Sequence, residues 1–136
     1  FNEFNGENVN AFKSLIEACG FIRSNFAGAN FSQSRITDTS FKSTCLLRAN
    51  FAHTDFDNVS FSYADLRDAT LSQCDLRDTD LRNADLRGAL IDGVRFPTHR
   101  LANMKITTEQ ATWATITNQL EKHHLDQCDI LSPEAP

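Results

Sequence analysis

No stretch of this 136-residue sequence approaches the roughly 20 consecutive apolar residues that a membrane-spanning helix needs, so we expect no membrane span. Cysteine is also sparse, because four cysteines without a Cys-x-x-Cys pair are too few for a disulfide-stapled scaffold. Basic residues do not outnumber acidic ones. The formal net charge of −5 therefore argues against direct nucleic acid binding through a basic surface.

The motifs that commonly carry enzyme chemistry are missing as well. The sequence has no glycine-rich phosphate loop, no His-Glu-x-x-His and no Gly-x-Ser-x-Gly. His123, His124, Asp126 and Cys128 lie close together in the sequence, but their spacing matches no usual zinc site. We therefore expect no catalytic residues, no metal site and no cofactor.

Methionine occurs once, at Met104, and the chain begins with Phe1. We therefore expect the natural N-terminus to be missing. The cysteines are expected to be free thiols, which favours a reducing compartment such as the cytoplasm.

Phenylalanine is abundant, with eleven residues against one Tyr and one Trp, and it follows a period of five. From Phe21 onward, every fifth residue is large and apolar. The series is Phe21, Phe26, Phe31, Ile36, Phe41, Leu46, Phe51, Phe56, Phe61, Leu66, Leu71, Leu76, Leu81, Leu86, Ile91, Phe96, Leu101 and Ile106.

A period of five fits neither an α-helix nor a flat strand, because either would scatter these side chains over several directions. It predicts a chain that turns a corner every five residues and winds into stacked coils around an apolar core. Small residues two positions before each centre support this pattern, and Gly, Asn or Asp often follow two positions after it. The small-residue pattern fails at His99 and Met104, so we expect the regular array to end near residue 96.

The stretches Ala29-Asn30-Phe31, Ala49-Asn50-Phe51, Ala64-Asp65-Leu66 and Ala84-Asp85-Leu86 resemble the repeat of pentapeptide repeat proteins. The resemblance implies an all-β solenoid, namely a right-handed quadrilateral β-helix over residues 20–106, with four pentapeptides in each coil. Residues one coil apart would then stack as an inward core ladder. The ladder residues are Phe21, Phe31, Phe41, Phe51, Phe61, Leu66, Leu81 and Leu86.

Both open ends of such a stack need covers, and we expect short helical caps. Residues 1–19 form the N-terminal cap, with a helix expected over residues 7–18. At the other end, Thr107 and Gln110 have capping-box spacing at the start of a helix within residues 107–124. Its apolar stripe of Trp113, Ile116 and Leu120 would cover the last coil or, as in several family members, join two copies as a homodimer. Residues 125–136 are expected to be a loose tail.

The outward positions carry mostly charge, in repeated Asp-Leu-Arg stretches whose charges neutralise one another. Ala27, Cys45 and Leu47 are an exception, because the four-repeat coil places them together on one side. This uncharged spot is a candidate docking patch.

Three functions remain open. The first is a non-enzymatic protein-interaction module or scaffold whose partner is another protein. The second is topoisomerase protection by DNA mimicry, because residues 61–69 resemble stretches of the Qnr quinolone-resistance proteins, which engage gyrase. Residues 20–106 carry about one net positive charge, however, so the excess acid lies at the two ends. The third is the β-helix segment of a larger secreted bacterial effector.

Overall fold

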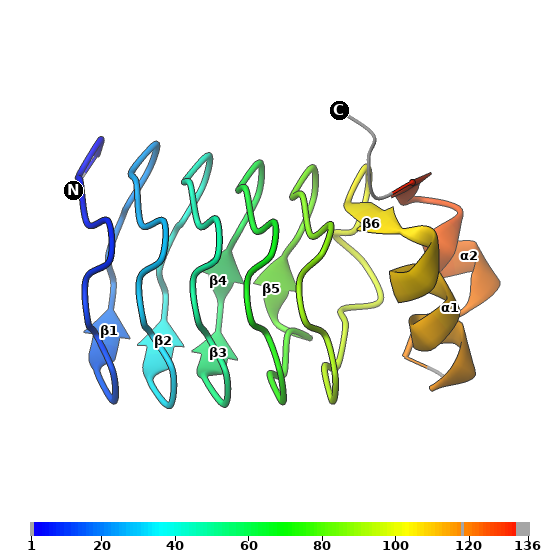
Figure 1. The fold of residues 1–136 in the computed structure, drawn as a ribbon, viewed down its shortest axis with the longest axis horizontal. Helices are drawn as coiled ribbons and strands as arrows, with labels where there is room; N and C mark the ends of the chain where they lie inside the picture. The colour runs from blue at the N-terminus through cyan, green and yellow to red at the C-terminus, as the bar shows by residue number, and fades with distance from the viewer. Residues whose placement is uncertain (1, 118, 133–136) are drawn as a thin grey trace.

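The computed structural model describes residues 2–117 and 119–132. Its main feature is a stack of coils, each of which returns to the same side of the stack after four five-residue repeats (Figure 1). The backbone pairings between these coils are parallel. The offset between paired residues stays the same from Asn5↔Asn25 at one end to Asp85↔Lys105 at the other.

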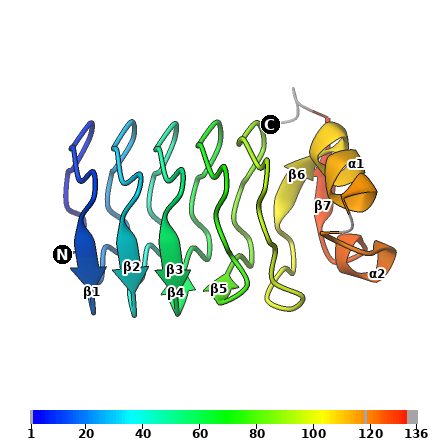
Figure 2. The same cartoon turned by 90° about the horizontal axis from the view of Figure 1, so that it is seen from below.

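The strands are short because the chain bends once in every five-residue repeat. β1 (Leu15–Glu17), β2 (Arg35–Thr37) and β3 (Asp55–Asp57) form one sheet, β4 (Val59–Ser60) pairs with β5 (Thr79–Asp80), and β6 (Lys105–Thr107) pairs with β7 (Asp129–Leu131). The helices of the described residues are α1 (Thr108–Ile116) and α2 (Lys122–Leu125). Both lie at the C-terminal end of the stack (Figure 2).

The bends use the left-handed backbone region, two residues after a repeat centre. Examples are Gly28 at a φ of 68° and Gln33 at 57°. Residues other than Gly, Asn and Asp rarely adopt this backbone region, so the pairing between coils must hold residues such as Gln33 in it. The expected bend at Thr98 is absent, and the next left-handed residue is Arg100 at 63°. Pro97 precedes this irregular segment and has no N–H to donate to a bend.

Side chains at the repeat centres fill the interior of the stack. Equivalent rings of successive coils stack nearly parallel, with centroid distances of 5.4 Å for Phe21–Phe41, 5.5 Å for Phe41–Phe61 and 5.0 Å for Phe31–Phe51. Of the predicted ladder, Phe31, Phe41, Phe51, Phe61, Leu66, Leu81 and Leu86 are at most 2% exposed, whereas Phe21 is half-buried. Each buried side chain of this size contributes about 1.5–3 kcal/mol to folding.

The helix predicted over residues 7–18 is wrong, because this segment forms another coil. β1 lies within it and pairs with β2, and the Gly6 and Ala11 N–H groups donate to the next coil at Asn25 O and Asn30 O, both at 2.7 Å. A helix of this length is marginal in isolation, and coil pairing satisfies the same backbone groups while it covers the core. The N-terminal cap is therefore a coil.

The C-terminal end differs from its prediction in two ways. The chain leaves the helical conformation after α1 and forms a second, shorter helix, α2. The expected loose tail instead contains β7, which extends the ladder beyond β6 with Ile106 opposite Ile130. The offset between these two strands is longer than in the coils because the chain passes through both helices between them. The end of the predicted tail, residues 133–136, lies outside the described residues.

The expected end of the array near residue 96 holds only in part. The segment 97–100 weakens the ladder, since no pairing joins Asp80 to Arg100 among the described residues, although the Leu81 N–H still donates to Arg100 O at 3.0 Å. Beyond it, Leu101 and Met104 are fully buried again and Asp85 pairs with Lys105. The coil therefore resumes after the irregularity and continues to β6.

Candidate protein-interaction face

One face of the stack holds the docking residues predicted from the sequence. Its rows lie in successive coils and are joined by pairings at their first positions; they are Asn5–Glu7, Asn25–Ala27, Cys45–Leu47, Asp65–Arg67, Asp85–Arg87 and Lys105–Thr107. We call it the patch face. It changes character along the stack, because the rows Asn25–Ala27 and Cys45–Leu47 are uncharged, the row before them holds Glu7, and the two rows after them each hold an Asp–Arg pair.

Ala27, Cys45 and Leu47 are brought together as predicted by the coil geometry. Asn25 pairs with Cys45, and the Gly28 N–H donates to Leu47 O at 2.9 Å, so the two rows are neighbours. All three side chains are half-buried. The patch is therefore shallow, and it can contribute apolar area to an interface without being a pocket.

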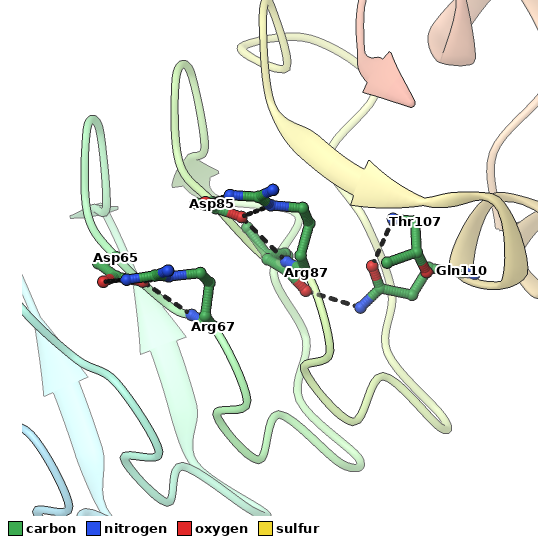
Figure 3. Close-up of polar contacts among 7 residues, drawn as sticks. Asp65, Arg67, Asp85, Arg87, Thr107 and Gln110 are labelled. Atoms are coloured by element: carbon green, nitrogen blue, oxygen red, sulfur yellow. Dashed lines mark hydrogen bonds and ion pairs between the residues drawn. The ribbon is translucent and has the colours of Figure 1, made fainter. Parts of the chain in front are cut away.

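The Asp–Arg pairs of this face are forks within a single coil (Figure 3). The Arg67 Nε and Nη2 atoms donate to the two oxygens of Asp65 at 2.8 and 2.7 Å, and the Arg67 backbone N–H donates to the same carboxylate at 3.2 Å. The spacing places Asp before an inward leucine and Arg after it, so both side chains point outward. Asp75–Arg77, Asp80–Arg82 and Asp85–Arg87 repeat this geometry.

Burial of the forks on the patch face increases toward the C-terminal end. The Arg67 side chain is 47% exposed, whereas the Arg87 side chain is 8% exposed. Burial alone would raise the pKa of Asp85, but the side chain, backbone N–H and charge of Arg87, with the charge of Lys105, hold it below its usual value. The Asp85–Arg87 pair is thus part of the covered end of the stack.

Thr107 and Gln110 attach α1 to this end, as their capping-box spacing predicts (Figure 3). Gln110 Oε1 accepts the Thr107 N–H at 2.8 Å, and Thr107 Oγ1 accepts the Gln110 N–H at 3.2 Å. Gln110 Nε2 also donates to Leu86 O at 2.6 Å and to Ala89 O at 3.0 Å. Ala89 O thereby gains the donor that a following coil would supply, while Leu86 O gains a second donor besides the Ala89 N–H at 3.0 Å. Sequence spacing does not reveal this role of Gln110.

The predicted stripe on α1 and beyond makes its contacts within the chain. Leu120 is buried and Trp113 packs against the core, while the side chain of Ile116 lies outside what the structure describes. These contacts fit a cap on the last coil. In the described part of the chain, no helix combines the length and the apolar character needed to cross a membrane.

Sequence reasoning missed a polar groove on a different edge of the stack. It has a volume of about 280 Å³ and is lined by Asp57, Asn58, Arg77, Asp78, Thr79, His99 and Arg100. The groove lies where the irregular segment 97–100 leaves the ladder, and the only signal for it was the break in the small-residue pattern at His99. Its acidic and basic side chains are mixed, so the groove favours no single ligand charge.

The cysteines and histidines form no reactive or metal-binding cluster among the described residues. Burial raises the pKa of the Cys74 thiol to about 11, and its Sγ donates to Phe51 O at 2.9 Å. Burial likewise raises the pKa of Cys128 to about 11. Thiols with such pKa values are weak nucleophiles near neutral pH. His124 Nδ1 accepts the Glu121 N–H at 3.1 Å and so belongs to the start of α2.

Comparisons with known proteins agree with this architecture. A family model described as "Pentapeptide repeat region" matches residues 14–91, which is more than half of the chain. No curated protein matches the sequence. The solved structure of Rfr23, a pentapeptide repeat protein from the cyanobacterium Cyanothece 51142, is 22% identical with a TM-score of 0.56, over 71% of this chain and 82% of that one.

Two further solved structures are similar. A trypsin-treated form of QnrB1, a plasmid-mediated fluoroquinolone resistance protein, is 20% identical with a TM-score of 0.60 over 78% of this chain. The match spans only 51% of QnrB1. A pentapeptide repeat protein from the Arabidopsis thaliana thylakoid lumen is 18% identical with a TM-score of 0.51, over 83% of this chain and 74% of that one. At such identities these likenesses show the fold alone.

Proposed function

Because the chain belongs to the pentapeptide repeat family, we propose that it is a non-enzymatic protein-interaction module built on a right-handed, four-sided β-helix. Family members are generally structural or interaction proteins rather than enzymes. The constant offset of the parallel pairings and the inward repeat centres support this architecture.

The observation that carries the proposal is the uncharged pair of rows on the patch face. Ala27, Cys45 and Leu47 gather on a flank where the following rows hold charged forks. Burying apolar area in an interface is favourable, whereas covering charged side chains requires compensating partners. A partner protein would therefore gain most by docking over the two uncharged rows, Asn25–Ala27 and Cys45–Leu47.

The size of a face limits how that partner binds. Five coils at the usual strand spacing of ~4.8 Å, on a side about three residues wide, offer only about 250 Å² of flat surface. A stable interface needs roughly 800 Å² on each partner. A partner held by this module must therefore extend around an edge of the stack and contact more than one face.

Affinity capture from the native host, read out by mass spectrometry, tests the interaction function. We expect Leu47→Asp to lose partners that the wild-type chain retains, because a carboxylate in the patch would have to be desolvated on binding. Leu90→Asp is the matched control, since Leu90 is an exposed leucine outside the patch face. Identical partners for the wild-type chain and Leu47→Asp would contradict the patch as the docking site.

Gyrase protection is an alternative function, which the structural likeness to QnrB1 motivates. It needs a decidedly acidic stack, but the carboxylates of Asp65, Asp75, Asp80 and Asp85 are each paired with an arginine of the same coil. A supercoiling assay of gyrase with a quinolone, with and without the purified chain, tests it. Rescue of supercoiling would replace the interaction-module proposal with this one.

Two further possibilities stay predictions. One is that the chain is a segment of a larger secreted effector, and the other is that it forms a homodimer through the C-terminal stripe. Sequencing of the complete gene tests the first, and light scattering of the purified chain tests the second. The burial of Leu120 within the chain supports a cap rather than a dimer contact.

A further inference from the structure

The surface around Arg48 differs from its surroundings in charge. Residues 25–32 and 45–52 stack directly on each other and continue from the patch face around the Gly28 and Arg48 bends onto the neighbouring face. Within these two stretches the only charged residue is Arg48. We call their outward side the Arg48 surface. Its outward residues are Asn25, Ala27, Gly28, Asn30, Cys45, Leu47, Arg48, Asn50 and Ala52.

Arg48 has no ion pair with any described residue. The nearest carboxylates by position belong to the next coil, and both are directed elsewhere. Asp65 is held by the fork of Arg67. The Asp68 Oδ1 atom occupies the space that a Cβ on Gly88 would take, so Asp68 leans over the coil on its far side from Arg48. The exposed guanidinium of Arg48 is thus left without an ion pair among the described residues.

The amides around Arg48 present donors rather than acceptors. Asn25 Oδ1 accepts the Ala27 N–H, Asn30 Oδ1 accepts the Ser32 N–H, and Asn50 Oδ1 accepts the Ala52 N–H, each at 3.0 Å. These bonds occupy the amide oxygens and fix the side chains, which leaves the Nδ2 groups to donate outward. Because the coil pairing holds the backbone, these donors are preorganised for a ligand.

A surface of this kind is complementary to a particular partner chemistry. Fixed N–H donors and one unpaired guanidinium require acceptors, and a carboxylate is the acceptor that also matches the charge. Leu47, Ala27 and Cys45 lie on the same surface and accept an apolar side chain. Arginine is also one of the residue types that often dominate the binding energy of interfaces.

We propose that the Arg48 surface binds an acidic segment of a partner protein, with an Asp or Glu carboxylate on the Arg48 guanidinium and an adjacent apolar side chain on Leu47. This inference rests on the proposed interaction function and adds the chemistry of the partner. The surface spans two faces and the bend between them, so an acidic segment bound there would form one part of the larger interface that this function requires.

Peptide selection on the purified 136-residue chain tests the inference. A random library of short peptides is selected on the wild-type chain, and the selected peptides are labelled and titrated by fluorescence polarisation. We expect them to be enriched in Asp and Glu beside apolar residues. Arg48→Gln should weaken their binding at least about tenfold and flatten its salt dependence. Leu47→Ser should weaken the binding with little change in that salt dependence.

The control for charge and backbone strain is Arg100→Gln. Arg100 also lies at a left-handed bend, but it lines the polar groove and is not part of the Arg48 surface. Glutamine is compatible with such bends, since Gln33 and Gln73 adopt φ values of 57° and 62° in this chain. Both variants should therefore fold, which urea unfolding verifies, and Arg100→Gln should bind the peptides like the wild-type chain.

The outcomes separate this inference from the proposed function. Peptides that bind Arg48→Gln as tightly as the wild type, or that are enriched in Lys and Arg, would overturn the acidic partner and leave an interaction function standing. Self-association of the chain that Arg48→Gln abolishes would assign the surface to a second copy and overturn it too. A wild-type chain that selects no peptide, together with captured proteins unchanged by Leu47→Asp, would overturn both proposals.

Discussion

Single residues decide how the first coil closes the core. Gly6 stands at a repeat centre, yet its missing side chain is essential to the packing. A Cβ there would overlap the Phe26 ring and lie 3.0 Å from Phe4 Cε1. The rings of Phe4 and Phe26 lie 5.7 Å apart and occupy the space that a larger centre would have filled. The small and large positions are thus exchanged in the repeat around Gly6.

We expect Gly6→Ala to lower the free energy of unfolding by about 1–3 kcal/mol, because the added methyl group overpacks this site. Urea unfolding at neutral pH measures the change. Gly20→Ala is the matched control and should be nearly neutral, since nothing lies within 4 Å of a Cβ built on Gly20. Equal unfolding free energies for the two variants would show that the Phe4 and Phe26 rings move aside without cost.

Among the elements, α1 and β7 cover the C-terminal end of the stack, whereas a coil closes the N-terminal end. The ladder continues from β6 into β7, while α1 is attached through Gln110 to the last regular coil. A parallel ladder leaves carbonyl groups without partners at its end, and an unpaired buried carbonyl costs about 1–3 kcal/mol. The Gln110 side chain supplies a donor to Ala89 O, adds a second donor to Leu86 O and anchors the start of the helix.

Gln110→Ala should therefore lower the free energy of unfolding by about 2–4 kcal/mol, because Ala89 O and the Thr107 N–H lose their partner and Leu86 O loses one of its two donors. Urea unfolding measures the loss. Hydrogen exchange should show faster exchange in α1 than in the N-terminal coils. Glu109→Ala, an exposed neighbour on the same helix turn, serves as the control. Unchanged exchange in α1 would mean that its other contacts hold it on the stack.

The whole molecule is a repeating stack in which each coil pairs only with its neighbours. The free energy of unfolding of such an arrangement is approximately a sum over coils and the interfaces between them. The fold therefore tolerates a change in the number of coils, but not a change in the register between them. The register follows from a period of five within a coil and four such repeats between paired residues. Removing anything other than whole repeats moves the repeat centres out of the core.

Deletion of residues 61–80 should thus leave a folded chain with a lower free energy of unfolding, since residue 81 then follows residue 60 in phase. Deletion of residues 61–78 removes almost as much chain but shifts the phase by two positions, and it should abolish cooperative unfolding. Circular dichroism and urea unfolding distinguish the two. Equal behaviour of the two deletions would mean that the five-residue register is not what holds the coils together.

The amino-acid sequence by itself determined the repeat, the inward centres and the family. The core is predictable because a large apolar side chain recurs at every fifth position, as at Phe31, Phe41 and Phe51. The four-repeat coil came with the family resemblance, and that coil length alone was enough to bring Ala27, Cys45 and Leu47 together.

Only the tertiary structure decided the ends and the electrostatics. Residues 7–18 have a plausible helical pattern, and pairing with the next coil overrides it because that pairing satisfies backbone groups and covers the core together. Neither the burial of Arg87 nor the isolation of Arg48 can be inferred from the sequence, since both depend on where Asp68, Gly88 and α1 place their atoms. Side-chain burial and ion pairing depend on contacts between coils. The repeat pattern within a coil therefore does not predict which arginine lacks an ion pair.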